Sequence, residues 1–262
     1  MQQSHQSDPR ILNRRTLQND HRYLAKLLRP GLSVLDVGCG AGAITAGIAE
    51  AVGPHGFVVG VDRDEANLEL ARREHPAVPN LRLELGDATT LTFQDQFDIV
   101  TAARTLQWIS EPALAISRMK AALKPSRMLV ILDYNLAANE WEPDPPSAFR
   151  DFYEAFLAWR KANLWDNRMA DRLPELFQSA CLVEIESHVQ DEIAERGSPD
   201  FDQHANLWFW VIETIGERIV EAGFLDRSQL QAAAERYEPW TQTELMRQTL
   251  IMRTVVGTKK PA

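Results

Sequence analysis

The sequence predicts an α/β fold: a doubly wound, mainly parallel sheet that is covered by helices on both faces. Two observations support this. Short runs of β-branched residues and leucine alternate with segments of helical periodicity through the first half of the chain, an order that is typical of parallel sheets. Acidic residues stand where several of these runs end, and ligands of such sheets bind at the carboxyl ends of the strands. The length of 262 residues fits one such domain with elaborations.

Residues 34–45, Val-Leu-Asp-Val-Gly-Cys-Gly-Ala-Gly-Ala-Ile-Thr, predict a strand, a glycine turn and the start of a helix. The first four residues form a short apolar run. After the turn, apolar residues recur at helical spacing until Gly53 and Pro54 end the helix. The turn needs glycine because it bends through angles that a Cβ atom would forbid, and because glycine lets a ligand touch the backbone. The N–H groups that open the helix favour an anionic group, either a carboxylate or a phosphate.

The glycine spacing alone is compatible with two kinds of ligand. Gly38, Gly40 and Ala43 also fit the dinucleotide-binding pattern G-x-G-x-x-G/A. Asp36 stands two residues before the first glycine and favours the other kind, because a carboxylate repels a pyrophosphate but attracts the ammonium of an amino-acid moiety. A turn that only packs the strand against the helix, without a ligand, is the third possibility.

The strands that follow place further acids at the same edge. Strands are expected at residues 57–62, 81–86, 97–103 and 128–133, with helices at 65–73 and 111–123. Asp62 ends the second strand, 24 residues after Gly38, where an acid can accept two hydrogen bonds from vicinal ribose hydroxyls. A dinucleotide-binding enzyme would use the same acid, so Asp62 does not separate the two ligands. Its alternative role, capping the next helix, is filled at least as well by Asp64.

The motif from Asp36 to Gly42, Asp-Val-Gly-Cys-Gly-Ala-Gly, closely resembles the first motif of the class I S-adenosylmethionine-dependent methyltransferases. Gly86-Asp-Ala88, Leu106-Gln-Trp108 and Leu123-Lys-Pro125 extend the resemblance to the small-molecule branch, of the type 11 or ubiquinone-biosynthesis-like kind. In that branch two glycines usually follow the last motif. Here Ser126 and Arg127 stand instead, a departure that affects the geometry of a turn more than the chemistry.

The resemblance implies a Rossmann-like, doubly wound seven-stranded sheet with an antiparallel last strand, and a helical lid formed by inserts in the second half. Residues 1–262 are then a single methyltransferase domain. Its parts are an N-terminal cover segment, a cofactor-binding core and two lid inserts, at residues 1–30, 31–134, about 135–170 and 198–240. The helix expected over 11–28 either covers the sheet or closes over the ligand, and the sequence leaves both possibilities open.

The resemblance also implies a site for S-adenosylmethionine, whose product is S-adenosylhomocysteine. Asp87 matches the acid that accepts a hydrogen bond from the adenine amino group, and Arg63 is expected along the adenosine. The cofactor-binding residues expected on this basis are Asp36, Gly38, Cys39, Gly40, Asp62, Arg63, Asp87, Ala88 and Ala103. No catalytic residue is assigned, because the sulfonium is already an activated donor and positioning can supply most of the acceleration. His188 and His204 are candidate bases for a substrate hydroxyl.

The second half of the chain is rich in aromatic residues. Helices are expected over 147–163, 173–180, 201–222 and from Asp226 to about Tyr237, and strands over 183–189 and 244–256. Of the seven tryptophans, only Trp108 lies within residues 31–134. The other rings either form the core of the lid or line an acceptor pocket. Since ligand pockets are mostly apolar, we expect some of them to face the substrate.

Composition narrows the class of protein further. The net charge is −9 and the pI is near 5.2, and no run rich in Lys or Arg occurs, which disfavours nucleic acid as a partner. No apolar run approaches the ~20 residues of a membrane span, and the first residues contain no apolar signal core. Cys39 and Cys181 are expected to be free thiols in a cytoplasmic protein. The six histidines show no metal-ligand spacing, so no metal is expected.

The sequence therefore predicts an S-adenosylmethionine-dependent methyltransferase (EC 2.1.1.-) that acts on a small, partly apolar acceptor. Methylation of oxygen, carbon or nitrogen remains open, as does the oligomeric state. Three alternatives stand beside this prediction: a nicotinamide-dependent oxidoreductase, a methyltransferase that acts on a macromolecule, and a binding protein without turnover.

Overall fold

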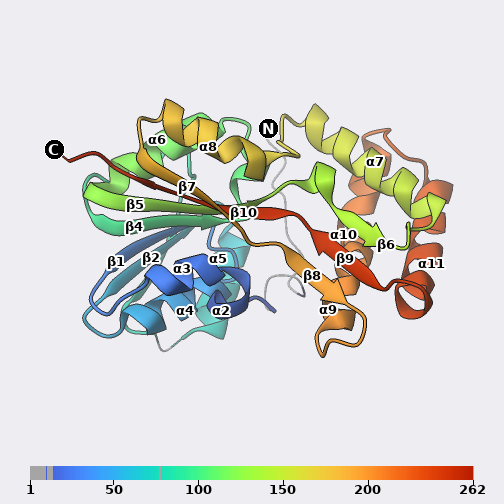
Figure 1. Ribbon diagram of the computed structural model, residues 1–262, viewed down its shortest axis with the longest axis horizontal. Coiled ribbons are helices and arrows are strands. Elements are labelled where there is room, and N and C mark those ends of the chain that lie inside the picture. The colour runs from blue at the N-terminus through green and yellow to red at the C-terminus, as the bar shows by residue number, and fades with distance from the viewer. Residues whose placement is uncertain (1–9, 11–13, 77, 262) are drawn as a thin grey trace. The chain divides into compact units, whose positions relative to one another are not determined.

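The computed structural model describes residues 10, 14–76 and 78–261, and the chain divides into two compact units. The first unit comprises Met1–Tyr134, Met169–Gln190 and Met252–Ala262, and the second comprises Asn135–Arg168 and Asp191–Ile251. The second unit is therefore inserted into the first in two pieces. Figure 1 labels the helices and strands.

The first unit contains a seven-stranded sheet of order β3-β2-β1-β4-β5-β10-β7. Neighbouring strands among β1 to β5 pair in parallel, whereas β10 runs antiparallel between β5 and β7. The doubly wound sheet with an antiparallel last strand is thus confirmed. The strands are β1 (Ser33–Val37), β2 (Phe57–Asp62), β3 (Leu81–Leu85), β4 (Phe97–Ala103), β5 (Leu123–Tyr134), β7 (Val183–Val189) and β10 (Met252–Thr258).

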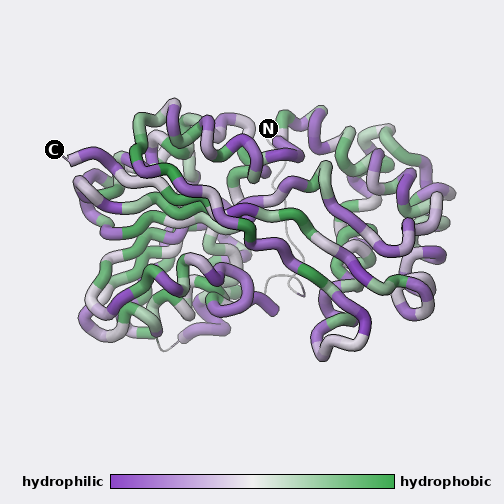
Figure 2. Tube along the Cα trace, in the orientation of Figure 1, coloured by the Kyte–Doolittle hydropathy of each residue, from purple (hydrophilic) through white to green (hydrophobic). Residues whose placement is uncertain are grey.

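Helices cover both faces of this sheet, as Figure 1 shows. On one face, α6 and α8 pack on the strands, in a buried cluster that includes Ile116 and Phe177. On the other, α2 to α4 pack in a second cluster that includes Leu24 and Ile48. Figure 2 shows hydrophobic residues concentrated along the central strands between these layers. The helices are α2 (Leu17–Asp20), α3 (Arg22–Leu27), α4 (Ala43–Val52), α5 (Glu65–Glu74), η1 (Leu106–Trp108), α6 (Pro112–Ala122) and α8 (Met169–Ser179).

Local signals in the sequence explain where the helices beside the site begin and end. Helix α4 follows Gly42, which has a left-handed conformation with φ 80°, and ends at Gly53, whose φ of 66° is one that glycine adopts readily. Helix α5 begins after Asp64, whose side chain accepts a hydrogen bond from the Ala66 N–H at 3.0 Å. Asp64 is therefore the N-cap, as expected, and Asp62 is not needed for that role.

The second unit combines a small antiparallel sheet of order β6-β9-β8 with four α-helices among its described residues. Its aromatic rings pack on one another: the Trp208 ring centroid lies 4.8 Å from that of Tyr153, and Phe149 stacks on Tyr237 at 4.2 Å. These rings form the core of the unit. The elements are η2 (Leu136–Ala138), β6 (Glu140–Glu142), α7 (Ser147–Ala162), β8 (Glu192–Glu195), α9 (Phe201–Ala205), α10 (Leu207–Glu221), α11 (Arg227–Thr243) and β9 (Arg247–Leu250).

Three expected elements are divided in the structure. The strand expected over 244–256 is two strands, β9 and β10, which belong to different sheets. The helix expected over 201–222 breaks at Asn206 into α9 and α10. The N-terminal helix breaks at His21, whose backbone leaves the helical region with φ −142° and ψ 52°. The start of that expected helix, at residues 11–13, lies outside the described residues.

Two other elements are longer in the structure than the sequence predicts. Strand β5 begins at Leu123, earlier than the expected residue 128, and α11 runs to Thr243, beyond Tyr237. The capping box from Asp226 to Gln229 is confirmed: the Asp226 side chain accepts from the Gln229 N–H, and the Gln229 side chain accepts from the Asp226 N–H. The free cysteines Cys39 and Cys181 are also confirmed. No helix in the described part of the chain is long and apolar enough to cross a membrane.

Candidate functional site

The glycine turn after β1 adopts the backbone angles that require glycine. The φ angles of Gly38, Gly40 and Gly42 are 78°, 55° and 80°, in the left-handed region where a Cβ atom costs energy. The turn is tied to the next strand, because the Gly38 and Cys39 N–H groups both donate to the Val61 carbonyl, at 2.7 and 3.1 Å. The backbone of the glycine turn is therefore held directly against the end of β2.

Asp62 lies at the end of β2 and is bound to the same turn. Its Oδ2 atom accepts the Gly40 N–H at 2.8 Å, and its Oδ1 atom accepts the Asp64 N–H at 2.9 Å. The Asn67 side-chain amide lies at 3.5 Å from Oδ1. The residue is only 9% exposed, so these bonds fix the orientation of its carboxylate. The Gly40 N–H is thus engaged by Asp62.

Asp36 is buried beneath the glycine turn. The Thr45 hydroxyl donates to its Oδ2 atom at 2.6 Å. Burial raises the pKa of Asp36 from 3.8 to about 6, the Thr45 hydrogen bond opposes this rise, and the negative charge of Asp62 adds to it. Burial also raises the pKa of the neighbouring Cys39 thiol, so the Cys39 side chain stays neutral. The site therefore contains a carboxyl group that titrates close to neutral pH.

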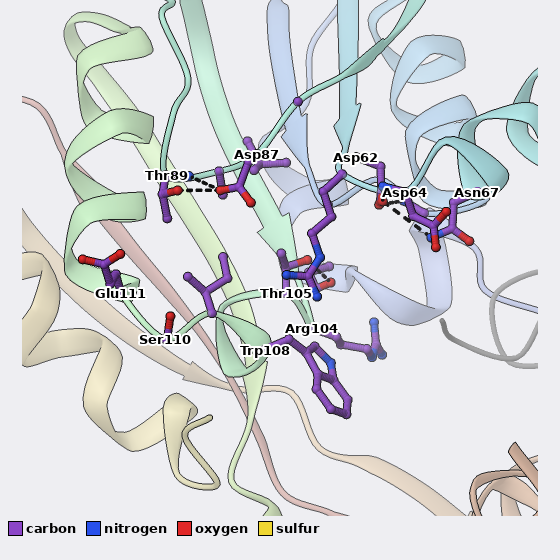
Figure 3. Close-up of a pocket in the computed structure, with 18 of the residues that line it drawn as sticks. Asp62, Asp64, Asn67, Asp87, Thr89, Arg104, Thr105, Trp108, Ser110 and Glu111 are labelled. Atoms are coloured by element: carbon purple, nitrogen blue, oxygen red, sulfur yellow. Dashed lines mark hydrogen bonds between the residues drawn. The ribbon is translucent and has the colours of Figure 1, made fainter. Parts of the chain in front are cut away.

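Asp87 follows β3 and has one of its two carboxylate oxygens engaged. Its Oδ1 atom accepts from the Thr89 N–H at 2.8 Å and from the Thr89 hydroxyl at 2.6 Å. Within the described residues no hydrogen bond uses the other oxygen. Figure 3 shows the Asp87 side chain beside Thr89 at the wall of the pocket. The arrangement presents an acceptor at a fixed position, which suits a ligand N–H or O–H group.

Gly38 and Gly40 of the glycine turn, together with Asp62 and Asp87, line a pocket at the carboxyl ends of the strands (Figure 3). Acids gather on its β2 and β3 side, while Arg104 and Trp108 lie away from Asp87 and Thr89. The lining consists of Arg15, Val37, Gly38, Gly40, Asp62, Arg63, Asp64, Asn67, Gly86, Asp87, Ala88, Thr89, Ala103, Arg104, Thr105, Trp108, Ile109, Ser110 and Glu111. A pocket with apolar and polar walls at this edge is the expected binding position in an α/β sheet.

The structure brings the nine predicted site residues together around this pocket and a smaller one. Seven of them line the first pocket: Gly38, Gly40, Asp62, Arg63, Asp87, Ala88 and Ala103. Asp36 and Cys39 line the smaller pocket, which shares Arg15, Gly38, Gly40 and Ala103 with the first. The prediction thus placed these residues at one location, while their role in binding stays a prediction.

Several lining residues were not predicted. Asp64, Asn67 and Thr89 stand within a few residues of the predicted acids, so proximity in sequence could have suggested them. Arg104 and Trp108 both follow β4. Trp108 belongs to the Leu-Gln-Trp motif whose family resemblance was noted, and Arg104 stands two residues before that motif. Arg15 has no such signal, because its place depends on how the N-terminal segment folds back onto the sheet.

Neither candidate base lies in these pockets. His188 stacks on Tyr23, with ring centroids 3.9 Å apart, and its Nε2 atom lies 3.1 Å from Glu186. His204 belongs to the second unit, with its ring nitrogens 3.6 Å from Glu192 and 3.4 Å from Asp200. Within the described residues no group of three or more His, Cys, Asp or Glu side chains could hold a metal ion.

The sheet order, the glycine turn after β1 and the acids after β2 and β3 define a Rossmann-like protein of the class I methyltransferase type. Comparison with known families agrees: residues 28–188, more than half of the chain, match the model of a methyltransferase domain. The chain belongs to this family, the class I S-adenosylmethionine-dependent methyltransferases.

Individual relatives share less. A demethylmenaquinone methyltransferase of Staphylococcus aureus is 38% identical over 107 residues, which are 40% of this chain and 44% of that protein. A phosphoethanolamine N-methyltransferase of Haemonchus contortus, solved with phosphomonomethylethanolamine and S-adenosylhomocysteine, has a TM-score of 0.58 at 18% identity, over 92% of this chain and 52% of that one. A SAM-dependent methyltransferase of Aquifex aeolicus has a TM-score of 0.51 at 20% identity, over 72% and 93% of the two chains. The chain spans less than half the length of the curated relatives it matches, and the two solved structures show a common fold.

Proposed function

We propose that the protein transfers a methyl group from S-adenosylmethionine to a small, partly apolar acceptor. The observation that carries the proposal is the hydrogen bond from the Gly40 N–H to the Asp62 carboxylate, in a pocket that Asp87 also lines. It unites a turn that accommodates an amino-acid moiety with an acid suited to a ribose. Family membership supports the same cofactor.

Each part of the cofactor has a chemically suitable partner in this proposal. The methionine moiety lies on Gly38 and Ala103, and its ammonium points toward Asp36. The carboxylate of Asp36 is negatively charged and attracts the positive ammonium. The ribose hydroxyls donate to Asp62, and the adenine amino group donates to the oxygen of Asp87 that Thr89 does not use. A pyrophosphate on the glycine turn would face the buried carboxyl group of Asp36, which disfavours a nicotinamide dinucleotide.

The chemistry requires positioning more than proton transfer. The sulfonium of the bound cofactor supplies an activated methyl group. The residues of the pocket orient it, and the apolar lining that includes Val37, Ala88 and Ile109 limits the access of water. An acceptor that is already nucleophilic needs no base, and the histidines of the candidate set lie outside the pocket. The lid expected from the inserts at about 135–170 and 198–240 stays a prediction, and the aromatic rings of the second unit pack on one another as its core.

The first test is calorimetric titration of the protein with S-adenosylmethionine and with S-adenosylhomocysteine. The informative variant is Asp62→Asn, which keeps an oxygen to accept the Gly40 N–H but lowers the capacity to accept from ribose hydroxyls. Asp98→Asn is the matched control, because Asp98 is also a buried acid but lines neither pocket. We expect Asp62→Asn to weaken binding about tenfold or more, as loss of a hydrogen bond to a charged group does, and Asp98→Asn to bind like the wild type.

Two results would contradict the proposal. The first is wild-type protein that binds neither compound but binds NADH, which would establish a nicotinamide enzyme. The second is tight cofactor binding with transfer of labelled methyl to bulk protein or tRNA and to no small acid, phenol or amine in a screen. Binding without any transfer would identify a protein that keeps the cofactor fold without turnover.

A further inference from the structure

A buried ion pair joins the N-terminal segment, residues 14–24, to the end of β4. The Arg104 guanidinium donates from Nη1 to the Asp20 carbonyl at 3.1 Å, and its Nη2 atom lies 3.4 Å from Asp20 Oδ1. Its Nε atom donates to the Tyr134 hydroxyl, at the end of β5, at 2.9 Å. The side chains of Arg104 and Asp20 are only 4% and 10% exposed. Neither charge has ready access to water, so each depends on the other.

Neighbouring polar contacts fasten the same segment to other strands. The Gln190 amide donates to the Asp20 carbonyl at 3.3 Å, and its oxygen accepts from the Tyr23 N–H and from the Thr254 hydroxyl, at 3.1 and 3.0 Å. His21 is fully buried, with Nε2 at 2.9 Å from the Thr101 hydroxyl of β4. Buried polar groups are costly when they lose their partners, so the segment has one favoured position on the first unit.

Asp20 connects this attachment to the pocket. While Oδ1 faces Arg104, its Oδ2 atom accepts the Thr16 N–H at 2.8 Å. The residue before Thr16 is Arg15, which lines both pockets. One carboxylate thus links a residue that follows β4 to the part of the N-terminal segment that forms the pocket wall.

Arg104 shows signs of a role beyond stability. Its backbone φ is 58°, a left-handed conformation that is uncommon for residues other than glycine and clusters at functional sites. A buried ion pair contributes little net stability compared with apolar residues of the same size, and is better explained by the position it specifies. Arg104 itself also lines the pocket, between Ala103 and Thr105.

From this geometry we infer that Arg104 is a positioning residue for the cofactor: through Asp20, which binds the Thr16 N–H, it holds the adjacent Arg15 in the wall of the cofactor pocket. The inference rests on the proposed function. It assigns the N-terminal segment to the ligand site and not only to the covering of the sheet. Cofactor in the pocket and the segment in its fastened position then stabilise each other.

A double-mutant cycle tests the ion pair. The variants are Asp20→Asn, Arg104→Met and the double variant, each titrated with S-adenosylhomocysteine. We expect each single variant to weaken binding about tenfold and the double variant to weaken it no further, because both changes break one connection. Equal affinity of all four proteins would overturn the inference, as would effects of the two single changes that add up in the double variant.

The matched control separates positioning from general destabilisation. Asp98 is also a buried acid of β4, but it lies near the amino end of the strand, away from the pocket. There it accepts from the Ser33 N–H at 3.0 Å and pairs with Lys124 at 3.0 Å. Asp98→Asn should lower the melting temperature and leave the affinity for S-adenosylhomocysteine unchanged. If Asp98→Asn weakened binding as much as Asp20→Asn, stability alone would explain both and the inference would fail.

A second measurement does not depend on affinity. Trypsin cleaves after Arg15 and after the exposed Arg22, both in the N-terminal segment. We expect S-adenosylhomocysteine to slow cleavage there in the wild type and in Asp98→Asn, but not in Arg104→Met at ligand concentrations that saturate it. Wild type that binds the ligand without any protection would refute the inference while leaving the proposed function intact. Wild type that does not bind would refute the function first.

Discussion

The side chain of Thr105 occupies the space beside Gly38. A Cβ atom placed on Gly38 would lie 2.3 Å from Thr105 Oγ1 and 3.0 Å from Thr105 Cβ, well inside any permitted contact. The glycine turn after β1 and the residue that follows β4 are therefore fitted to one another. Two constraints act on Gly38 at once: its left-handed φ of 78° and this contact.

Gly38→Ala should therefore be strongly destabilising and should abolish cofactor binding. The left-handed backbone costs about 1–2 kcal/mol for a residue with a Cβ atom, and the forced contact adds about 1–3 kcal/mol. Gly223→Ala is the control, because Gly223 has the same φ of 78° but nothing within 4 Å of its would-be Cβ. Chemical denaturation should show a cost for Gly223→Ala that reflects the backbone alone. Thr105→Gly should partly rescue Gly38→Ala, and a lack of rescue would argue against the contact.

Asp36 should make stability depend on pH between about 4 and 6. Its folded pKa of about 6 lies above the ordinary value of 3.8, so the native state binds the proton more tightly than the unfolded chain does. Stability is then greatest below the ordinary value and falls as pH rises through this window, by about 3 kcal/mol in total. Asp36→Asn keeps an acceptor for Thr45 and should remove this fall. The free energy of unfolding of the wild type and of Asp36→Asn, measured from pH 4 to 7, checks the prediction. If the two proteins showed the same dependence of this free energy on pH, the prediction would be contradicted.

Thr89 should sharpen the recognition of adenine, if the proposed role of Asp87 holds. Thr89→Val removes the hydroxyl that donates to Asp87 Oδ1 at 2.6 Å and leaves the carboxylate less well oriented. We expect the preference for S-adenosylhomocysteine over its inosine analogue, which lacks the amino group, to narrow severalfold. Thr90→Val is the matched control, because the Thr90 hydroxyl lies 3.3 Å from the Asp87 carbonyl and not from the carboxylate. If Thr89→Val and Thr90→Val showed the same preference for S-adenosylhomocysteine over the inosine analogue, a specific role for Thr89 would be excluded.

Ser126→Gly should stabilise the protein. Ser126 stands where the resembled family usually has glycine, and its φ is 61°, so it bears a left-handed conformation that glycine adopts freely. Relief of the strain outweighs the extra freedom of glycine in the unfolded chain, for a gain of roughly 0.5–1 kcal/mol. Ser126→Ala tests the loss of the hydroxyl without this relief. Thermal denaturation should rank the glycine variant above both the wild type and the alanine variant.

The strands and helices of the first unit could be predicted because their periodicity is strong. Residues 57–62 and 97–103 are apolar runs that are buried on both faces, and the structure has these boundaries. Strands β6 and β8 could not be predicted, because their sequences Glu-Trp-Glu and Glu-Ile-Ala-Glu contain no apolar run and depend on pairing with β9. The break at Ile251 was missed because apolar residues continue on both sides of it, while its N–H bonds to Asn139, 112 residues away.

The residues of the site also fall into those that could be predicted from the sequence and those that could not. The glycine turn and the acids at Asp62 and Asp87 could be placed from sequence because each follows a strand directly. The contact of Arg104 with Asp20 joins residues 84 positions apart, and no local pattern indicates it. The sequence therefore indicates the place of the pocket, but it leaves open whether the N-terminal segment covers the sheet or closes over the ligand.

The hydrogen bond between Gly40 and Asp62 has a consequence for how the site can vary. Asp62 also accepts from the Asp64 N–H, at the start of α5, so a shift in the first turn of that helix reaches the glycine turn 22 residues earlier. The parts of the pocket assigned to the two halves of the ligand are thus mechanically one piece. Adenosine and methionine, added as separate fragments, should each bind more tightly when the other is bound. A substitution in the part of the pocket for one fragment should also affect the binding of the other fragment.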